Sequence, residues 1–170
     1  MLTLTALALV LSLDSQAATQ AAAQAPPAPV PAIYISKEEH EKVLAEQIEK
    51  KVVDQPIKSG QVLGGLTSVA TLHRVKPEVT SLIHDTVTET YYILSGSGTL
   101  VTGGSLIGAK PIDLTRLNVG MGQNGTRQGG VSQRVKPGDV IVIPAGTPHG
   151  FSELDGPISY LVFRFGPTVK

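Results

Sequence analysis

From Gly60 onward the sequence is a succession of short β-prone runs separated by glycine- and proline-rich turns, and this feature limits the possible folds most. The runs are rich in Val, Ile, Thr, Tyr and Phe, which fit strands better than helices. No helical periodicity separates one run from the next, so the strands must pair antiparallel, in a sandwich or a barrel. The expected strands are residues 66–75, 80–84, 89–94, 98–102, 131–135, 140–143, 150–153 and 158–165.

Turn residues mark the ends of several of these runs. Gly96-Ser97-Gly98, Lys136-Pro137-Gly138-Asp139 and Asp155-Gly156-Pro157 are typical turn sequences. The stretch 103–130 is longer and glycine-rich, with a single apolar-alternating piece at 112–119. We expect it to be a surface excursion, and long loops of this kind often border a functional site.

A single helix is expected ahead of the strands. Ser36 and Glu39 have the spacing of a capping box, which marks the start of a helix. Apolar residues then recur at helical spacing among charged ones: Val43, Leu44, Ile48 and Val52. The pattern predicts an amphipathic helix over residues 37–53, ended by Pro56. We expect residues 36–60 to pack on the outside or one mouth of the β-domain, with binding to a partner as the alternative.

The first part of the chain has a different composition. Residues 2–13 carry no charge, a length that fits the apolar region of a signal peptide and is too short to span a bilayer. Ser15-Gln16-Ala17 offers a cleavage site and Ala23-Gln24-Ala25 a second, although no Lys or Arg precedes the apolar stretch. We predict a signal peptide over 1–17, and hence export to the periplasm or the medium. The alternative is a disordered, alanine-rich tail. The Ala-, Gln- and Pro-rich segment 18–35 indicates a flexible linker.

Length and composition exclude several classes of protein. A chain of 170 residues is long enough for one domain, with a core of its own. The formal net charge is zero and no basic patch stands out, so we expect no nucleic-acid partner. The chain has no cysteine, so disulfides, thiolate metal sites and cysteine nucleophiles are excluded. Any bound metal must therefore have nitrogen and oxygen ligands.

Three side chains stand out as candidate metal ligands: His84, Glu89 and His149. Two imidazoles and one carboxylate that converge inside a β-domain leave coordination positions open for water or substrate. This ligand set is used by non-haem iron sites and also suits manganese, nickel or zinc. Strand alternation places Tyr91 on the same face as Glu89, and Glu153 on the same face as His149.

These residues resemble the two motifs of the cupin superfamily. The segment from His84 to Glu89, followed by Gly96, matches the second half of the first motif, G-x5-H-x-H-x(3–4)-E-x6-G. The segment from Gly138 to His149 matches every fixed position of the second motif, G-x5-P-x-G-x2-H-x3-N, through the histidine. The resemblance covers residues 66–165. It implies an all-β, antiparallel jelly-roll barrel over residues 61–170 that holds one divalent metal ion (Fe, Mn, Ni or Zn).

The chain departs from the cupin pattern at positions that bear on metal binding. Leu82 replaces the first histidine of the H-x-H pair, and Glu153 replaces the asparagine of the second motif. His73 could supply a third imidazole, or could simply pair with a neighbouring strand. The alternative to a metal site is a polar interior in which the metal has been lost. Against that alternative, Glu89 would be a costly buried charge without a metal or a cation nearby.

Three further side chains are candidates for chemistry on a bound molecule. The Glu-x-Tyr arrangement of Glu89 and Tyr91 is similar to that of cupin lyases acting on dimethylsulfoniopropionate, where a tyrosine near the metal is the base. A phenol can act so only if its pKa falls from about 10 towards neutrality; otherwise Tyr91 is an interior aromatic. Glu153 is a second candidate acid or base, or a surface carboxylate. Arg164 could bind a carboxylate substrate, or point to solvent.

Two classes of function remain open. The first is a metal-dependent enzyme acting on a small organic molecule by dioxygenase, lyase or isomerase chemistry. The second is a non-catalytic cupin that binds a small molecule or sugar and keeps its cavity without turnover. The resemblance also implies a homodimer, since cupins commonly pair through their sheets. A small-molecule ligand is the expected partner in either class, and no membrane span is expected in the mature form.

Overall fold

The computed structural model describes residues 30–62 and 64–167. The predicted signal peptide, 1–17, and most of the predicted linker, 18–35, lie outside the described residues. The elements in chain order are α1 (Lys37–Lys50), β1 (Asp54–Val62), β2 (Gly65–Arg74), β3 (Ser81–His84), β4 (Thr88–Ser95), β5 (Gly98–Thr102), β6 (Ser105–Asp113), the 3-10 helix η1 (Thr115–Leu117), β7 (Met121–Gln128), β8 (Val131–Val135), β9 (Val140–Ile143), β10 (His149–Leu154) and β11 (Ile158–Gly166).

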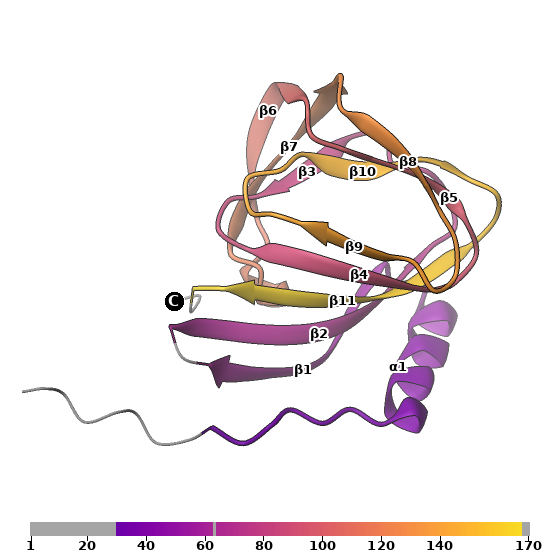
Figure 1. Ribbon diagram of the computed structural model, residues 1–170, viewed down its shortest axis with the longest axis vertical. Coiled ribbons are helices and arrows are strands. Elements are labelled where there is room, and N and C mark those ends of the chain that lie inside the picture. Colours follow the sequence, from indigo (N-terminus) through magenta and orange to yellow (C-terminus); the bar gives the residue numbers. More distant parts are fainter. Residues whose placement is uncertain (1–29, 63, 168–170) are drawn as a thin grey trace, which may run out of the picture.

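The strands form two antiparallel sheets that face one another (Figure 1). The five-stranded sheet has the order β1-β2-β11-β4-β9, and the six-stranded sheet has the order β6-β7-β3-β10-β5-β8. The predicted all-β, antiparallel fold with one helix is confirmed. The predicted closure into a barrel is not: within the described residues no strand pairing joins the two sheets, so the fold is a jelly-roll-like sandwich. None of the described helices is long and apolar enough to cross a membrane.

The hydrophobic core lies between the two sheets. It contains inward-facing side chains of both sheets, among them Ile93, Leu100, Ile143, Phe151 and Tyr160. The rings of Phe151 and Tyr160 lie 5.6 Å apart, which links the six-stranded sheet to the five-stranded one. Strand alternation produces this layer, because every second side chain of each strand faces the opposite sheet.

The stretch 103–130, expected as a surface excursion, contains two strands and a short helix instead. β6 and β7 form a hairpin, and β7 adds to the edge of β3 with Ser81 opposite Gly125. The sequence signal was weak because most side chains of β6 stay exposed, so no alternation of apolar and polar residues marks this strand. The backbone hydrogen bonds of the ladder, rather than burial of an apolar face, define it.

The helix is shorter than the predicted range 37–53, and a strand follows it directly. Lys51 adopts a left-handed conformation (φ 56°) and caps the helix, whose last residue is Lys50. The part of 36–60 beyond residue 53 is therefore the edge strand β1 and not part of a helical unit. Pro56 is tolerated there because β1 has a free edge and its register shifts between Pro56 and Lys58.

Helix α1 packs on β1 and β2, but not through the predicted apolar stripe alone. The predicted cap is confirmed, since the backbone N–H of Glu39 donates to the Ser36 hydroxyl at 3.1 Å. Ile48 stays largely exposed, whereas Gln47 is fully buried. The Gln47 amide donates to the carbonyl oxygens of Val53 (2.7 Å) and Thr71 (3.0 Å). Polar bonds to the sheet thus hold the end of the helix in place.

Candidate metal centre

The three predicted ligands meet in the space between the sheets. His84 is the last residue of β3 and His149 the first of β10, and both belong to the six-stranded sheet. Glu89 lies near the start of β4 in the five-stranded sheet. All three side chains are buried, with exposed fractions of 5 % for His84, 1 % for Glu89 and 4 % for His149. Each sheet therefore contributes part of the donor set.

The turn before β10 positions both imidazoles. The backbone N–H of Gly146 donates to the His84 carbonyl at 2.8 Å, and that of Thr147 donates to Pro144 at 3.2 Å. Gly146 has a positive φ of 77°, which side-chain-bearing residues rarely adopt. The Pro-x-Gly-x-x-His segment thus folds back against the end of β3. His149 then starts its strand beside His84, with ring centroids 5.2 Å apart.

The donor atoms converge on one point. His84 Nε2 and His149 Nε2 each lie 3.4 Å from the same Glu89 oxygen, Oε2. One ligand atom from each residue lies within 4.8 Å of the others. Two donors held about 2.1 Å from one ion at a tetrahedral angle stand about 3.4 Å apart, so this separation fits a metal ion. The group has the composition of a two-histidine, one-carboxylate site with open positions.

The surroundings of the second nitrogen of each imidazole also bear on whether the group can hold a metal ion. His149 Nδ1 donates a hydrogen bond to the carbonyl oxygen of Thr147 at 2.9 Å, which orients the ring with Nε2 towards Glu89, and a metal ion would take the place of the proton on Nε2. His84 Nδ1 is buried and has no hydrogen-bond partner among the described residues. The His84 ring is therefore not held by a network of its own. Among the described residues, therefore, a partner that would orient a metal-bound imidazole is present for His149 and not for His84.

A buried arginine shares Glu89 with the histidines. Arg164 Nε donates to Glu89 Oε1 at 2.8 Å, and the guanidinium also pairs with both oxygens of Asp54, at 3.2 and 2.5 Å. Burial raises the pKa of Glu89, but the hydrogen bonds from His149 and His84 and the charge of Arg164 outweigh it. They hold the pKa of Glu89 well below its usual range. Glu89 is thus ionised, with Oε2 left for the histidines and an ion.

The pKa values of His149 and Tyr91 also depend on the charge of Glu89. Burial lowers the pKa of His149, but its contact with Glu89 outweighs burial and raises that pKa above the ordinary 6.5. The Tyr91 hydroxyl donates to Glu89 Oε2 at 2.9 Å. Burial, reinforced by the charge of Glu89, raises the pKa of Tyr91 well above its ordinary value of 10.0. Without a metal ion, therefore, Tyr91 is a hydrogen-bond donor that orients Glu89, and its role as a base stays a prediction.

A cavity of about 180 Å³ surrounds the donor group. Several of its lining residues were not singled out from the sequence. Asp54 lies at the start of the unexpected strand β1, and Leu114, Leu117 and Val119 come from the segment around η1. Val119 belongs to the apolar-alternating piece at 112–119, which was the one available signal that this stretch contacts the interior. The predicted proximity of the excursion to a site is thus correct, although its structure was not foreseen.

Two predicted site residues lie elsewhere. His73 faces outward from β2, and its Nδ1 lies 2.9 Å from the Ser159 hydroxyl, so it does not join the donor group. Glu153 is exposed and accepts a hydrogen bond from Thr99 at 2.9 Å. A register shift in β10 between Phe151 and Glu153 inserts Ser152 as an extra residue. This bulge turns Glu153 away from the face of His149, on which strict alternation had placed it.

Comparisons with known proteins bear on the fold. No protein-family model and no curated protein sequence matches the chain. Among solved structures, it is similar to the Bacillus halodurans protein BH2720, with a TM-score of 0.51 and 16 % identity over 82 % of this chain and 86 % of that one. It is also similar to the DMSP lyase DddQ from Ruegeria pomeroyi (TM-score 0.39, 20 % identity, 59 % of this chain). A third is a cupin protein from Bacteroides fragilis (TM-score 0.36, 18 % identity, 59 % of this chain and 65 % of that one).

The extent of these matches limits what they say. The chain spans 38 % of the length of the lyase from Ruegeria pomeroyi, and identities of 20 % or less describe the fold alone. Two facing antiparallel sheets with one helix define an all-β, jelly-roll-like sandwich. That architecture agrees with the all-β, antiparallel jelly-roll fold that the sequence predicts, and it places His149, the last residue of the segment from Gly138 to His149, at the inner cavity.

Proposed function

We propose that this chain is a metal-dependent enzyme that acts on a small organic molecule. One observation carries the proposal: His84 Nε2 and His149 Nε2 both lie 3.4 Å from Glu89 Oε2 inside a cavity between the sheets. In this proposal His84, Glu89 and His149 hold one divalent ion. Such an ion would supply Lewis-acid chemistry on a substrate oxygen, or oxygen chemistry if it were iron.

The remaining side chains of the cavity have supporting roles in this proposal. Arg164 occupies Glu89 Oε1 and so keeps the carboxylate turned with Oε2 towards the imidazoles. Tyr91 donates to the same Oε2 and fixes its position from the other side. Leu114 and Leu117 form part of the apolar wall that excludes water. A dry, oriented donor set strengthens every charge interaction with a bound molecule.

Metal content of the purified protein tests the proposal. We expect about one equivalent of Fe, Mn, Ni or Zn per chain by inductively coupled plasma mass spectrometry, after purification without chelator. His84→Ala and His149→Ala should each lose the ion. The matched control is His40→Gln, because His40 lies on α1 and does not line the cavity. Folded wild-type protein that takes up none of the four ions would contradict the proposal.

A second candidate function is a binding protein without turnover. The specific observation in its favour is the ion pair between Arg164 and Glu89, which neutralises the carboxylate without a metal. Leu82 at the position of a cupin ligand points the same way. Under this alternative the protein binds none of the four ions, and a small molecule raises its melting temperature equally with and without chelator.

We also propose that the chain is exported after removal of residues 1–17. The uncharged stretch 2–13 and the small-x-small site ending at Ala17 support this. Fractionation of the native host, followed by intact-mass measurement, tests it. A periplasmic or secreted protein that begins at Ala18 is the expected result, or at the residue after Ala25 for the second site. A cytoplasmic protein that retains Met1 would contradict it.

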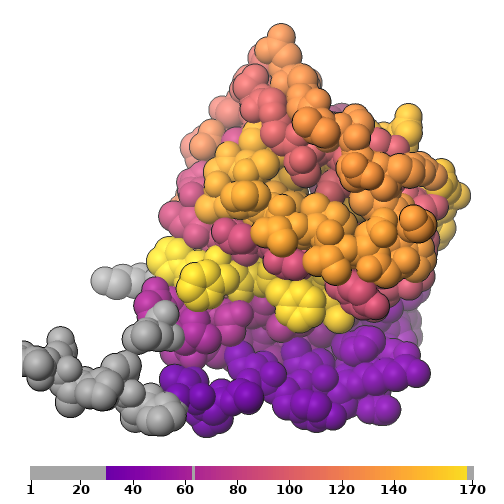
Figure 2. All heavy atoms as spheres, in the orientation of Figure 1, coloured from indigo at the N-terminus to yellow at the C-terminus, as the bar shows by residue number. Residues whose placement is uncertain are grey.

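We further propose a homodimer through the outer face of the five-stranded sheet. Five large apolar side chains are between 40 and 62 % exposed there: Tyr92, Val140, Val142, Phe163 and Phe165. They are neighbours across β9, β4 and β11, since Tyr92 lies opposite Val140 and Phe163 opposite Thr90. Figure 2 shows the yellow band of β11 at the surface of this part of the molecule. Contiguous apolar surface of this kind marks protein contacts, and a two-fold contact would cover it on both copies.

A further inference from the structure

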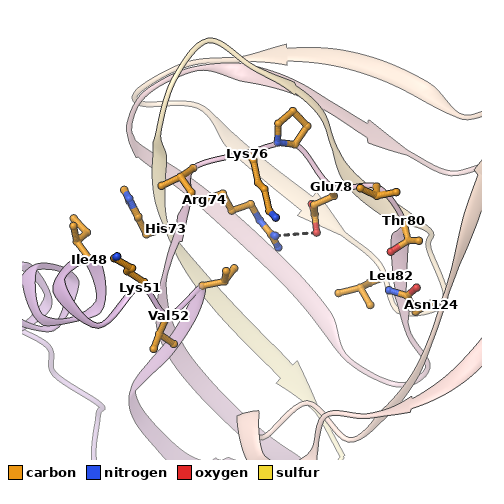
Figure 3. Close-up of a pocket in the computed structure, with 14 residues that line it drawn as sticks. Ile48, Lys51, Val52, His73, Arg74, Lys76, Glu78, Thr80, Leu82 and Asn124 are labelled. Carbon is orange, nitrogen blue, oxygen red and sulfur yellow. Dashed lines mark ion pairs between the residues drawn. The ribbon is translucent and has the colours of Figure 1, made fainter.

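A second, larger cavity of about 560 Å³ lies beside the candidate metal centre. Its walls are the end of α1 on one side and the connection from β2 to β3 on the other (Figure 3). This volume falls in the range of sites for drug-sized molecules, which is roughly 300–1,000 Å³. The cavity at the donor group, at about 180 Å³, holds only a few heavy atoms of such a molecule.

The two cavities adjoin. Val53, Arg74, Glu78 and Leu82 line both of them. Leu82 stands where the cupin motif has a histidine, two residues before His84 on β3. A leucine there cannot bind a metal, but it provides an apolar wall that both spaces share. Leu82 and the Arg74–Glu78 ion pair, in which the closest atoms are 2.9 Å apart, therefore lie where the outer cavity adjoins the cavity of the donor group.

The outer cavity exposes large apolar side chains. Val79 is 96 % exposed and Val75 67 %, both on the connection from β2 to β3. Ile48, Val52 and Val53, from the opposite wall, are between 38 and 45 % exposed. Single exposed apolar residues are ordinary, but five around one cavity form a patch that a ligand would cover.

The same cavity carries an excess of positive charge. Lys51, Lys76 and Arg74 line it against a single carboxylate, Glu78. Glu78 is already satisfied, because it pairs with Arg74 and accepts the backbone N–H of Phe151 at 2.8 Å. Within the described residues, neither lysine side chain forms an ion pair or a hydrogen bond. Figure 3 shows Lys76 pointing inward, towards the Arg74–Glu78 pair in this view.

We propose that the outer cavity binds a small amphipathic carboxylic acid. Its apolar body lies on Val75, Val79 and Leu82, and its carboxylate pairs with Lys76, while Lys51 adds positive charge at the opposite wall (Figure 3). Arg74 is committed to Glu78 and to the Tyr160 hydroxyl (2.9 Å), so no free guanidinium fork is available for a phosphate. Two lysines as point charges beside apolar walls suit a monoanion better. If the acid is the substrate of the enzyme, this inference rests on the proposed function. Binding of the acid to the outer cavity does not itself require the metal ion.

Isothermal titration calorimetry on the metal-free mature chain tests the chemistry of the ligand. The probes are 4-phenylbutyrate, its uncharged amide, 4-phenylbutylamine and inorganic phosphate. We expect the acid to bind about tenfold more tightly than the amide, and the amine and phosphate to bind more weakly still. Equal binding of acid and amide would refute the role of charge. Absence of binding by both would refute the site itself.

Matched variants locate the site. Lys76→Met should weaken binding of 4-phenylbutyrate about fivefold, the effect of losing one partly solvated ion pair. Lys136→Met removes a lysine from the distant turn before β9 and should leave binding unchanged. Val79→Asp, at an almost fully exposed position that tolerates a charge, should weaken it by repulsion as well. Wild-type affinity in both Lys76→Met and Val79→Asp would overturn the proposal.

A third comparison separates this inference from the metal proposal. His149→Ala should lose the metal ion but keep its affinity for 4-phenylbutyrate, because His149 does not line the outer cavity. Protein that binds the acid but no metal would leave the cavity assigned and the metal-dependent function refuted. Protein that binds metal but not the acid would refute only the present inference.

Discussion

Arg164 is the residue on which the charge balance of the interior depends. Its side chain is 4 % exposed and lies between two carboxylates, one on β4 and one on β1. A buried Glu89 without a counter-charge would destabilise the fold in the absence of metal. Arg164 supplies that counter-charge from a strand that the donor histidines do not use. Arg164 therefore gives Glu89 a counter-charge in the folded protein even without a metal ion.

Removal of this arginine should be costly. Arg164→Met leaves Glu89 and Asp54 buried without a counter-charge, so we expect the free energy of unfolding of the metal-free protein to fall by about 3–5 kcal/mol. Urea denaturation measures it. The matched control, Arg134→Met, breaks a surface ion pair with Asp155 in which both side chains are 52 % exposed. That variant should cost no more than about 1 kcal/mol. A similar loss in both variants would contradict the role given to Arg164.

The histidines should titrate in a defined order in metal-free protein. The pKa of His149 is raised by Glu89 and that of His73 is lowered by burial, so His149 should titrate above 6.5 and His73 below it. Protonated His149 stabilises the fold, and this contribution is lost as the pH rises through its folded-state pKa. NMR of the imidazole protons measures both values. The reverse order would contradict the site geometry, whereas zinc should abolish the titration of His149 and leave that of His73 unchanged.

At the scale of the elements, α1 depends on one polar side chain. Gln47 is fully buried and donates to two carbonyl oxygens, of Val53 and Thr71. Gln47→Ala removes both bonds and leaves a cavity, so we expect a loss of about 2–3 kcal/mol in the free energy of unfolding. Lys42→Ala, on the exposed side of α1, is the control and should cost less than about 0.5 kcal/mol. Thermal and urea denaturation, with circular dichroism as the signal, measure both. A loss below 1 kcal/mol in Gln47→Ala would mean that apolar packing alone holds the helix.

The sequence was sufficient for strands bounded by turn residues and insufficient for strands that neither turn residues nor an alternating pattern mark. Residues 98–102, 131–135 and 140–143 match β5, β8 and β9 to the residue, because turn residues bound them. β1, β6 and β7 were missed, since none of the three has a regular alternation of apolar and polar residues, and β6 is mostly exposed as well. β1 was further disguised by Pro56, which is permitted there only because the strand has a free edge.

The residues of the candidate site were also predictable only in part. Motif spacing alone was enough to predict that His84, Glu89 and His149 lie close together. Each of them lies next to a turn, and the turn determines which face of the sheet the side chain is on. Arg164 was recognised only as a possible carboxylate binder, since its partners Glu89 and Asp54 are 75 and 110 positions away. Glu153 was misplaced by one inserted residue, Ser152, and no local signal in the sequence announces such a bulge.

At the scale of the whole molecule, the donor group joins the two sheets. The histidines come from the six-stranded sheet and Glu89 from the five-stranded one, so a bound ion would cross-link the sandwich. At a free ion concentration of 100 times Kd, binding adds about 2.7 kcal/mol of stability. For a domain of this size that raises Tm by roughly 5–10 °C. Differential scanning fluorimetry with each of Fe, Mn, Ni and Zn measures the shift. His149→Ala should show none, and an equal shift in that variant would place the ion elsewhere.

In the proposed homodimer, the outer face of the five-stranded sheet forms the contact between the two copies. Tyr92, Phe163 and Val142 lie on it, and the inward-facing Arg164 places its charge on the opposite side of the sheet. A face without charge at its centre can pack against its own copy without burying an unpaired ion. A charge introduced there would lie close to the same charge of the second copy across the two-fold axis, and the two would repel each other. We therefore expect the wild type to be a dimer and Phe163→Lys a monomer by light scattering coupled to size-exclusion chromatography.

The control for this variant is Val131→Lys, at an exposed apolar position on β8 of the other sheet. It should remain a dimer, since it adds the same charge outside the proposed contact. A wild-type monomer, or dissociation in both variants, would contradict the assignment of this face. Because Phe163 and Arg164 are adjacent on β11, the dimer contact and the interior ion pair lie on opposite faces of one strand. Dissociation of the dimer should therefore reduce metal affinity only if the sheet itself is disturbed. The metal content of the Phe163→Lys monomer would measure this effect.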